Sequence, residues 1–192
     1  MKEVVILAKG KSRTQCQFDC EIWGVSNVWE SFKDDPRFRV DKIFYFDNDP
    51  LTRDTWVPWV KENLKVPVVS CHEWADEPFP FDEIAAKPWA KPPCRAEPFY
   101  SNSLCYMIAY AVYLGYDKIS LYGCDMVWGS EYVLEKGGME HWIGVAQGRG
   151  IEVYIPPGGH LCLSLSGEVY GKEDENGKGM YQSVKTIVCE PA

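Results

Sequence analysis

The chain has 192 residues, of which 46% are hydrophobic and 25% charged, a composition that fits one compact domain and excludes a wholly disordered chain. Its net charge of −8 leaves no basic face of the kind on which nonspecific nucleic-acid binders depend, so we expect no nucleic-acid polymer as a partner. Aromatic residues make up 14% of the chain, more than one small core normally needs, and we expect some of them to line a pocket or an interface.

The N-terminus and the cysteines predict a reduced, cytoplasmic protein. The apolar run 4–8 is too short for a signal peptide, and no run of about twenty apolar residues predicts a membrane span. The eight cysteines form no Cys-x2-Cys knuckle, and only three histidines are present to complete a metal site. We therefore expect neither a zinc site, nor a disulfide framework, nor contact with a membrane.

Short apolar runs in the first third of the chain predict buried parallel strands that end in turns. These runs are residues 4–8, 21–25, 42–46 and 66–69. A helix is expected between the last two, because Trp56, Val60 and Leu64 recur at helical spacing.

Residues 71–100 break this pattern. Six prolines argue against a regular helix or a central strand there, and a long stretch without regular structure is typical of a lid or a binding loop. Its aromatic side chains favour packing over disorder. We therefore expect a Pro- and aromatic-rich lid or loop over this range.

The rest of the chain alternates helices and strands. The expected elements are a buried helix over 104–114, a strand over 118–123, a short helix over 140–147 and a strand over 151–155. This alternation predicts an α/β fold over residues 1–156, with a Rossmann-like, mostly parallel sheet and helices on both faces. An Asn-Gly turn signal near residue 176 predicts a hairpin in a C-terminal arm, 157–192.

Polar residues follow the expected strands at their carboxyl ends, where ligands bind in open α/β sheets. The candidate ligand-binding residues are Gly10, Lys11, Ser12, Asn27, Asp47, Asn48, Asp125 and, at the start of the buried helix, Ser101, Asn102 and Ser103. Gly, Ser and Asn in one crevice suit phosphate, ribose and base groups, and a helix N-terminus favours an anion. The alternative is that these residues only cap helices and form turns.

Established phosphate and metal motifs do not fit this sequence. A P-loop requires a glycine at the position of Val5, and no Gly-x-Gly-x-x-Gly is present. Asp47-Asn48-Asp49 has the Asp-x-Asp outline of metal-dependent glycosyltransferases, but Asp-Asn-Asp-Pro is also a strong turn sequence. We favour the turn, so a magnesium ion is possible but not favoured and no metal ligand is assigned.

Three features together resemble a known group of proteins: the first strand ending in Gly10-x-Ser12, Asn27 after the second strand, and Ser101-x-Ser103 leading into L-G-Y-x-K-I-x-L-x-G-x-D from Leu114 to Asp125. The pattern is similar to the lipooligosaccharide sialyltransferases and the related hydroxymethylpterin pyrophosphokinase-like Rossmann proteins. It also resembles a broad group of small phage proteins. The resemblance covers roughly residues 3–155.

The resemblance implies that the matching residues Gly10, Ser12, Asn27 and 101–103 contact a nucleotide, as they hold the donor's cytidine nucleotide in the sialyltransferases. The sialyltransferase turn reads Gly-x-Gly-Pro-Ser, whereas this chain has a lysine, Lys11, in place of the proline. We expect Lys11, with Lys9, to pair with a phosphate.

The resemblance also implies a candidate general base. The family's base is a histidine, and His141 is expected to open the matching last helix, where it could deprotonate an acceptor hydroxyl. Packing or ligand contact is the alternative role for His141. Glu140 could accept hydrogen bonds from ribose hydroxyls.

Two functions are therefore in competition. The favoured one is a protein that binds a nucleotide-derived small molecule, as a phage protein would to sequester a host nucleotide signal in the host cytoplasm. The alternative is a nucleotide-sugar-dependent glycosyltransferase with His141 as general base. A third possibility is a degenerate Rossmann domain that serves as an assembly subunit, and we expect a homo-oligomer in each case.

Overall fold

A computed structural model describes residues 1–92, 95–127 and 129–163 of the chain, with the side chains of 129–133 left out. The strands are β1 (Glu3–Leu7), β2 (Glu21–Val25), β3 (Lys42–Phe44), β4 (Val68–Ser70), β5 (Glu77–Pro78), β6 (Lys118–Tyr122) and β7 (Glu152–Tyr154). The α-helices are α1 (Val57–Asn63), α2 (Phe81–Ala85), α3 (Ser103–Tyr113) and α4 (Gly129–Gly148). Short helical segments are η1 (Lys11–Gln15), η2 (Val28–Phe32), η3 (Thr52–Trp56) and η4 (Pro88–Ala90).

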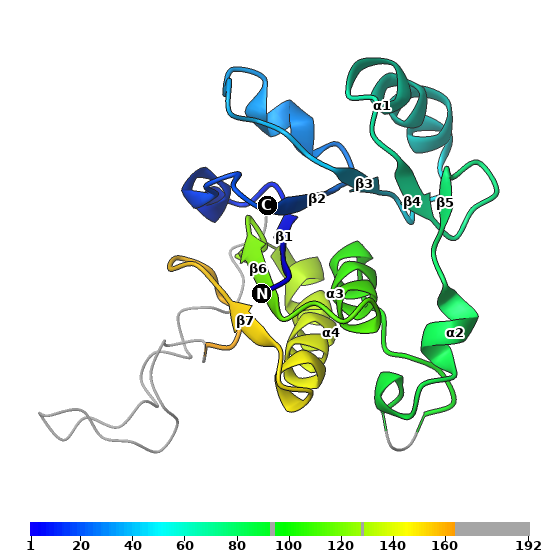
Figure 1. Cartoon of the computed structure of the whole chain (residues 1–192), viewed down its shortest axis with the longest axis vertical. Helices are drawn as coiled ribbons and strands as arrows, with labels where there is room; N and C mark the ends of the chain where they lie inside the picture. The colour runs from blue at the N-terminus through cyan, green and yellow to red at the C-terminus, as the bar shows by residue number, and fades with distance from the viewer. Residues whose placement is uncertain (93–94, 128, 164–192) are drawn as a thin grey trace, which may run out of the picture.

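The strands form one parallel sheet in the order β5-β4-β3-β2-β1-β6-β7 (Figure 1). From β1 the chain adds strands in one direction up to β5, and α3 then carries it back to the other side of β1. The strand order therefore reverses between β1 and β6, which is the place where ligands bind in sheets of this type.

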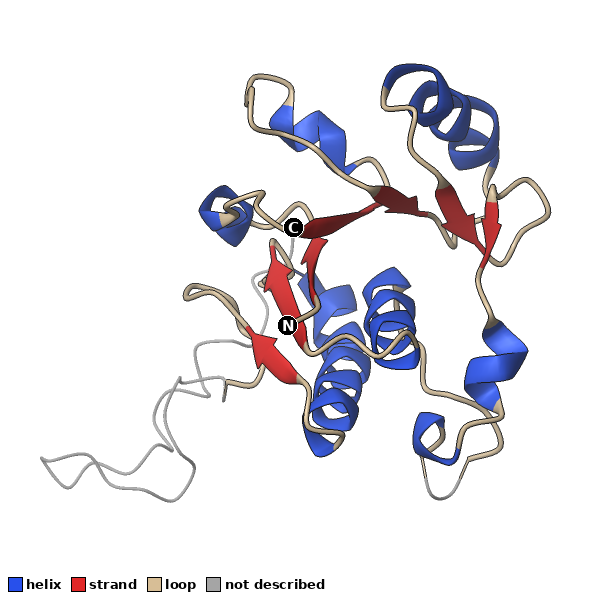
Figure 2. Cartoon of the chain, viewed as in Figure 1, coloured by secondary structure: helices blue, strands red, loops and turns tan. Residues whose placement is uncertain are grey.

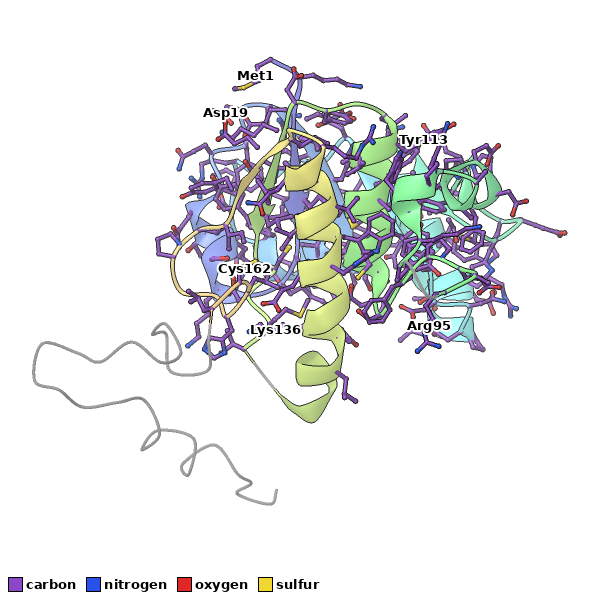
Figure 3. The ribbon with its side chains drawn as sticks, turned by 90° about the horizontal axis from the view of Figure 1, so that it is seen from below. Met1, Asp19, Arg95, Tyr113, Lys136 and Cys162 are labelled. Carbon is purple, nitrogen blue, oxygen red and sulfur yellow. The ribbon has the colours of Figure 1, made fainter. Side chains whose placement is uncertain are left out.

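Both faces of the sheet are buried. Along β1, Val4 and Ile6 belong to the hydrophobic core beneath α3 and α4, while Val5 and Leu7 belong to the core beneath η1, η2 and α1. Figures 1 and 2 show these two layers, and Figure 3 shows α3 and α4 side by side. The predicted α/β, Rossmann-like fold with helices on both faces is confirmed, and its sheet is entirely parallel.

The last helix is longer than the sequence suggested. The prediction that it spans 140–147 is wrong, because α4 begins at Gly129 and has 20 residues. Glycines in its middle lower helix propensity, but one of them has a packing role. A Cβ at Gly138 would lie 2.0 Å from Ser101 Oγ, so glycine lets α4 approach the start of α3.

The segment 71–100 contains more regular structure than expected. The prolines do not exclude α2, since Pro80 stands just before its first turn, and β5 pairs with β4 at the edge of the sheet, where proline is tolerated. The packing predicted for the aromatic side chains is confirmed in part: Phe79 is buried and Phe81 and Trp89 pack against the core, whereas Phe99 is 43% exposed.

A column of stacked rings joins the segment before α3 to α4. Successive centroids lie 4.1 Å apart for Phe46 and Tyr106, 3.9 Å for Tyr106 and Tyr100, and 5.3 Å for Tyr100 and Trp142. The Trp142 indole N–H donates to the Phe99 carbonyl at 2.7 Å. These contacts hold the chain rigidly just before Ser101.

The expected C-terminal hairpin lies outside the described residues. In the part of the chain that the structure describes, no helix combines the length and the apolar character needed to span a bilayer.

Candidate functional site

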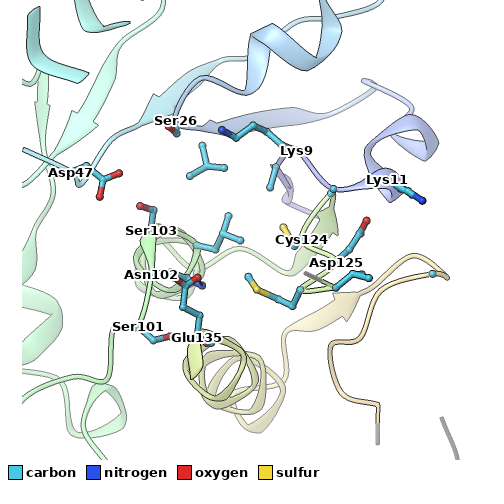
Figure 4. Close-up of a pocket in the computed structure, with 18 residues that line it drawn as sticks. Lys9, Lys11, Ser26, Asp47, Ser101, Asn102, Ser103, Cys124, Asp125 and Glu135 are labelled. Carbon is cyan, nitrogen blue, oxygen red and sulfur yellow. Dashed lines mark hydrogen bonds between the residues drawn. The ribbon is translucent and has the colours of Figure 1, made fainter. Parts of the chain in front are cut away.

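A pocket of about 930 Å³ lies beyond the carboxyl ends of β1, β2, β3 and β6, at the reversal of strand order (Figure 4). We call it the switch-point pocket. Its polar side chains are Lys9, Lys11, Ser26, Asp47, Ser101, Asn102, Ser103, Asp125 and Glu135. The volume falls within the range of about 300–1,000 Å³ that is usual for small-molecule sites.

A buried hydrogen-bond network stabilises one wall of the pocket. The Ser12 hydroxyl donates to Asp125 Oδ1 and accepts from the Gly123 N–H at 2.8 Å, while the Ser12 N–H donates to Asp125 Oδ2 at 3.0 Å. The Gly10 N–H donates to the Gly123 carbonyl at 2.8 Å. These bonds join the turn after β1 to the turn after β6, so the two turns form a single rigid wall.

The N-terminus of α3 forms the opposite wall. The Asn102 side chain accepts the Cys105 N–H at 3.1 Å, which caps the helix, and donates to Glu135 Oε2 at 3.0 Å. The Ser101 hydroxyl donates to the Glu135 carbonyl at 2.7 Å, so α4 supports this wall. The helix dipole at this end favours a bound anion.

Lysines and the carboxylate of Asp47 surround the opening. Lys9 Nζ donates to Asn27 Oδ1 at 2.5 Å, and Figure 4 shows Lys9 reaching along the pocket toward Ser26. Lys11 points away from the centre of the pocket, and Asp47 lies at the far side. Lys9 is therefore the better placed cation, although the sequence had directed attention first to Lys11.

The backbone is strained at two lining residues. Ser26 has a φ of 52° and Met126 a φ of 49°, in the left-handed region that residues other than glycine rarely adopt. Strain of this kind clusters at ligand sites, where the surrounding structure holds it in place.

The pocket gathers most of the ligand-binding residues predicted from the sequence. Gly10, Lys11, Asp47, Ser101, Asn102, Ser103 and Asp125 line it. Ser12 and Asn27 lie just behind the lining and hold Asp125 and Lys9.

Two other predicted residues make contacts elsewhere. Asn48 accepts the Trp74 indole N–H at 3.3 Å, and Glu140 accepts the Cys162 N–H at 2.6 Å. Neither side chain lines the pocket.

The Asp47-Asn48-Asp49 sequence has no regular secondary structure and leads into a helical segment, where Asp49 accepts hydrogen bonds from Thr52. Asp49 accepts the Thr52 N–H at 3.0 Å and the Thr52 hydroxyl at 2.7 Å, and these bonds lower the pKa of Asp49. Within the described ranges, no group of three or more His, Cys, Asp or Glu side chains has a metal-binding arrangement. Asp47 alone of the three residues reaches the pocket.

His141 does not open the last helix, as expected from the sequence, but lies within it, because α4 begins twelve positions earlier at Gly129. Its ring packs against Phe99 and Trp142, with centroids 6.0 and 5.5 Å away, and it does not line the switch-point pocket. His141 Nε2 is buried and has no hydrogen-bond partner in the described part of the chain. This environment supports the packing role rather than that of a general base.

The fold resembles that of a bacterial sialyltransferase. A structure of the sialyltransferase CstII from Campylobacter jejuni with the substrate analogue cytidine-5'-monophosphate superposes with a TM-score of 0.50 and 15% identity, over 84% of this chain and 80% of that chain. A second structure of CstII, with CMP-3FNeuAc, gives a TM-score of 0.52 and 16% identity, over 84% and 81%. No protein-family model and no curated protein sequence matches the chain. At this identity the likeness to CstII shows a shared fold.

Two polar side chains of the described lining were not recognised from the sequence. Ser26 follows β2 directly, so the end of that strand was a usable signal, but attention went to Asn27. Glu135 lies in a part of α4 that was not expected to be helical, and no sequence pattern predicted its contact with Asn102.

Removing the cap of α3 should loosen the pocket wall. We expect Asn102→Ala to lower the free energy of unfolding by about 1–2 kcal/mol, because the Cys105 N–H loses its side-chain acceptor. Asn102→Ser, which retains a capping oxygen, should recover most of the loss. Urea unfolding of the three proteins measures this, and equal losses for both variants would contradict the capping role.

The partly buried His141 should make stability depend on pH. Burial lowers the pKa of His141 below its ordinary value of 6.5, so below that pH the unfolded chain takes up a proton that the folded chain does not. The free energy of unfolding therefore decreases as the pH falls from 6.5 toward the lower pKa of His141 in the folded protein. We expect wild type to lose more stability than His141→Gln between pH 7.5 and 5.5 in urea unfolding. Parallel losses would contradict this assignment.

Proposed function

We propose that the chain binds a nucleotide-derived small molecule in the switch-point pocket. The observation that carries the proposal is the meeting of the α3 N-terminus, Lys9 and Asp47 around one cavity at the reversal of strand order. The α3 N-terminus and Lys9 suit a phosphate, and the carboxylate of Asp47 can accept a hydrogen bond from a ribose hydroxyl. The solved CstII complexes, which contain cytidine-5'-monophosphate and CMP-3FNeuAc, support the choice of nucleotide as ligand class.

We propose the following roles for the lining residues. The phosphate accepts hydrogen bonds from the start of α3, with Ser103 as the side-chain donor, and Lys9 leaves Asn27 to pair with it. Asp47 accepts from the ribose. Lys11 needs a change of rotamer to reach the same phosphate.

Binding without turnover is the favoured form of this function. Its support is the packing of His141 outside the pocket and the absence of any histidine among the described lining residues. Such a protein could sequester a nucleotide signal, in keeping with the resemblance of the sequence to small phage proteins.

Glycosyl transfer from a nucleotide sugar is the second candidate, and the fold shared with CstII favours it. Because His141 lies away from the lining, a transferase would need a carboxylate of the pocket, Asp47 or Glu135, as its general base. His141→Ala would then leave transfer unchanged, whereas Asp47→Asn or Glu135→Gln would abolish it.

One experiment separates the two candidates. The protein is incubated with the four ribonucleoside monophosphates and with CMP-sialic acid, and retained and released compounds are identified by mass spectrometry. Recovery of intact ligand supports binding without turnover, and release of CMP from the sugar nucleotide supports transfer. If no nucleotide is retained or raises the melting temperature, the proposal is wrong in both forms.

A further inference from the structure

A second cavity, of about 490 Å³, lies on the other face of the sheet, between η2 and the helical segment formed by η3 and α1. Three tryptophans line it, Trp29, Trp56 and Trp59, and we call it the tryptophan cavity. Glu30 and Phe38 also contribute to the lining. Its volume is again in the range of small-molecule sites.

The indole rings of this cavity are held rigidly. Trp29 and Trp59 stack with centroids 4.8 Å apart and an interplanar angle of 12°, and Trp56 stacks on Tyr45 at 6.2 Å. Trp29 is buried, whereas Trp59 is 38% exposed. A large aromatic side chain that is both exposed and fixed loses little conformational entropy when a ligand covers it.

Aromatic rings in this layer already attract cations. The guanidinium of Arg13 lies over Phe32 at 5.9 Å, and that of Arg37 lies over Phe18 at 5.7 Å. Among the described residues, no lysine or arginine lies over Trp56 or Trp59. Among aromatic side chains, the indole ring of tryptophan binds cations on its face most strongly.

Glu30 supplies a fixed negative charge at the cavity. Its Oε2 accepts the Asn27 amide at 2.5 Å, and Asn27 is buried and itself accepts from Lys9. In the described part of the chain, Glu30 Oε1 has no hydrogen-bond partner. The charge of Asp35 is compensated by Arg37 at 2.7 Å, so Glu30 is the carboxylate available to a ligand. The exposed Lys33 also lines the cavity.

We propose that the tryptophan cavity is a second ligand site, and that it binds a small organic cation. The ammonium group lies against the indole faces of Trp56 and Trp59, and Glu30 is its counter-ion. The proposal does not rest on the nucleotide function, since none of its three main residues lines the switch-point pocket, although Glu30 and Lys9 share Asn27 as a hydrogen-bond partner.

A matched pair of probes tests the proposal without any nucleotide. Choline carries a trimethylammonium group, and 3,3-dimethylbutan-1-ol has the same shape without the charge. Their affinities are measured on the full chain by saturation-transfer NMR of the methyl signals. We expect saturable binding of choline that is at least about tenfold tighter than that of the alcohol.

Variants locate the binding. Trp59→Ala and Glu30→Gln should each weaken choline binding about tenfold or more, whereas Glu62→Gln, which removes the same charge from α1 outside the cavity, should not. The melting temperatures of the variants show whether each is folded. Equal binding of choline and the alcohol, unchanged binding in Trp59→Ala, or the absence of saturable choline binding would overturn the proposal.

Discussion

Gly123→Ala should destabilise the protein by about 2–5 kcal/mol, a large part of the stability of an ordinary domain. Gly123 has a φ of +70°, where alanine costs about 1–2 kcal/mol, and a Cβ there would lie 2.1 Å from the carbonyl oxygen of Ala8. Because that oxygen belongs to the backbone, the turns after β1 and β6 must separate, which adds about 1–3 kcal/mol. Urea unfolding followed by circular dichroism measures the loss.

Gly115→Ala is the matched control for this substitution. Gly115 has nearly the same φ, +69°, but a Cβ there would have no atom within 4 Å. Gly115→Ala should therefore lower the free energy of unfolding only by the cost of placing alanine in the left-handed conformation, about 1–2 kcal/mol. If the two variants lose the same stability, close contact between the two turns does not hold the pocket wall together.

Lys9→Met should weaken the binding of a nucleoside monophosphate about 10- to 100-fold. The variant keeps the length of the side chain but removes the cation, and a hydrogen bond to a charged group contributes about 1.5–3 kcal/mol. Binding of the corresponding nucleoside, which lacks the phosphate, should change much less. Isothermal titration calorimetry with both ligands measures the difference.

Lys91→Met serves as the control for Lys9→Met, since Lys91 is exposed and lines neither cavity. It should leave both affinities unchanged. If Lys9→Met weakened nucleoside and nucleotide equally, Lys9 would not contact the phosphate.

The sequence predicted the sheet well, because strand formation here depends on local pattern. β1 falls on the fully apolar run 4–8, and β2 has the predicted bounds, Glu21–Val25. The buried helix α3 was predicted equally well, since apolar side chains lie on nearly every side of it and Asn102 caps its N-terminus.

The errors have a common cause in tertiary contacts. Gly138 weakens the local helical signal, yet it is what allows α4 to reach Ser101, so the helix was predicted too short. His141 then seemed to open that helix, when it lies inside it against Phe99.

The sequence predicted which loops line the pocket, but it did not predict where their side chains point. The turn after β1 does line the pocket, and Ser101–Ser103 do stand at a helix start there. The Ser12 hydroxyl holds Asp125 by a hydrogen bond between segments more than a hundred residues apart, and Lys11 points away from the centre of the pocket.

A nucleotide that occupies the switch-point pocket should slow backbone hydrogen exchange around it, and mass spectrometry measures this exchange peptide by peptide. Exchange is compared with and without whichever of the four nucleoside monophosphates is retained most tightly. We expect slower exchange in peptides that cover 8–11, 101–104 and 123–127, and unchanged exchange in 28–38 and 55–64 around the tryptophan cavity. Protection confined to 28–38 and 55–64, or to neither cavity, would contradict binding of the nucleotide in the switch-point pocket.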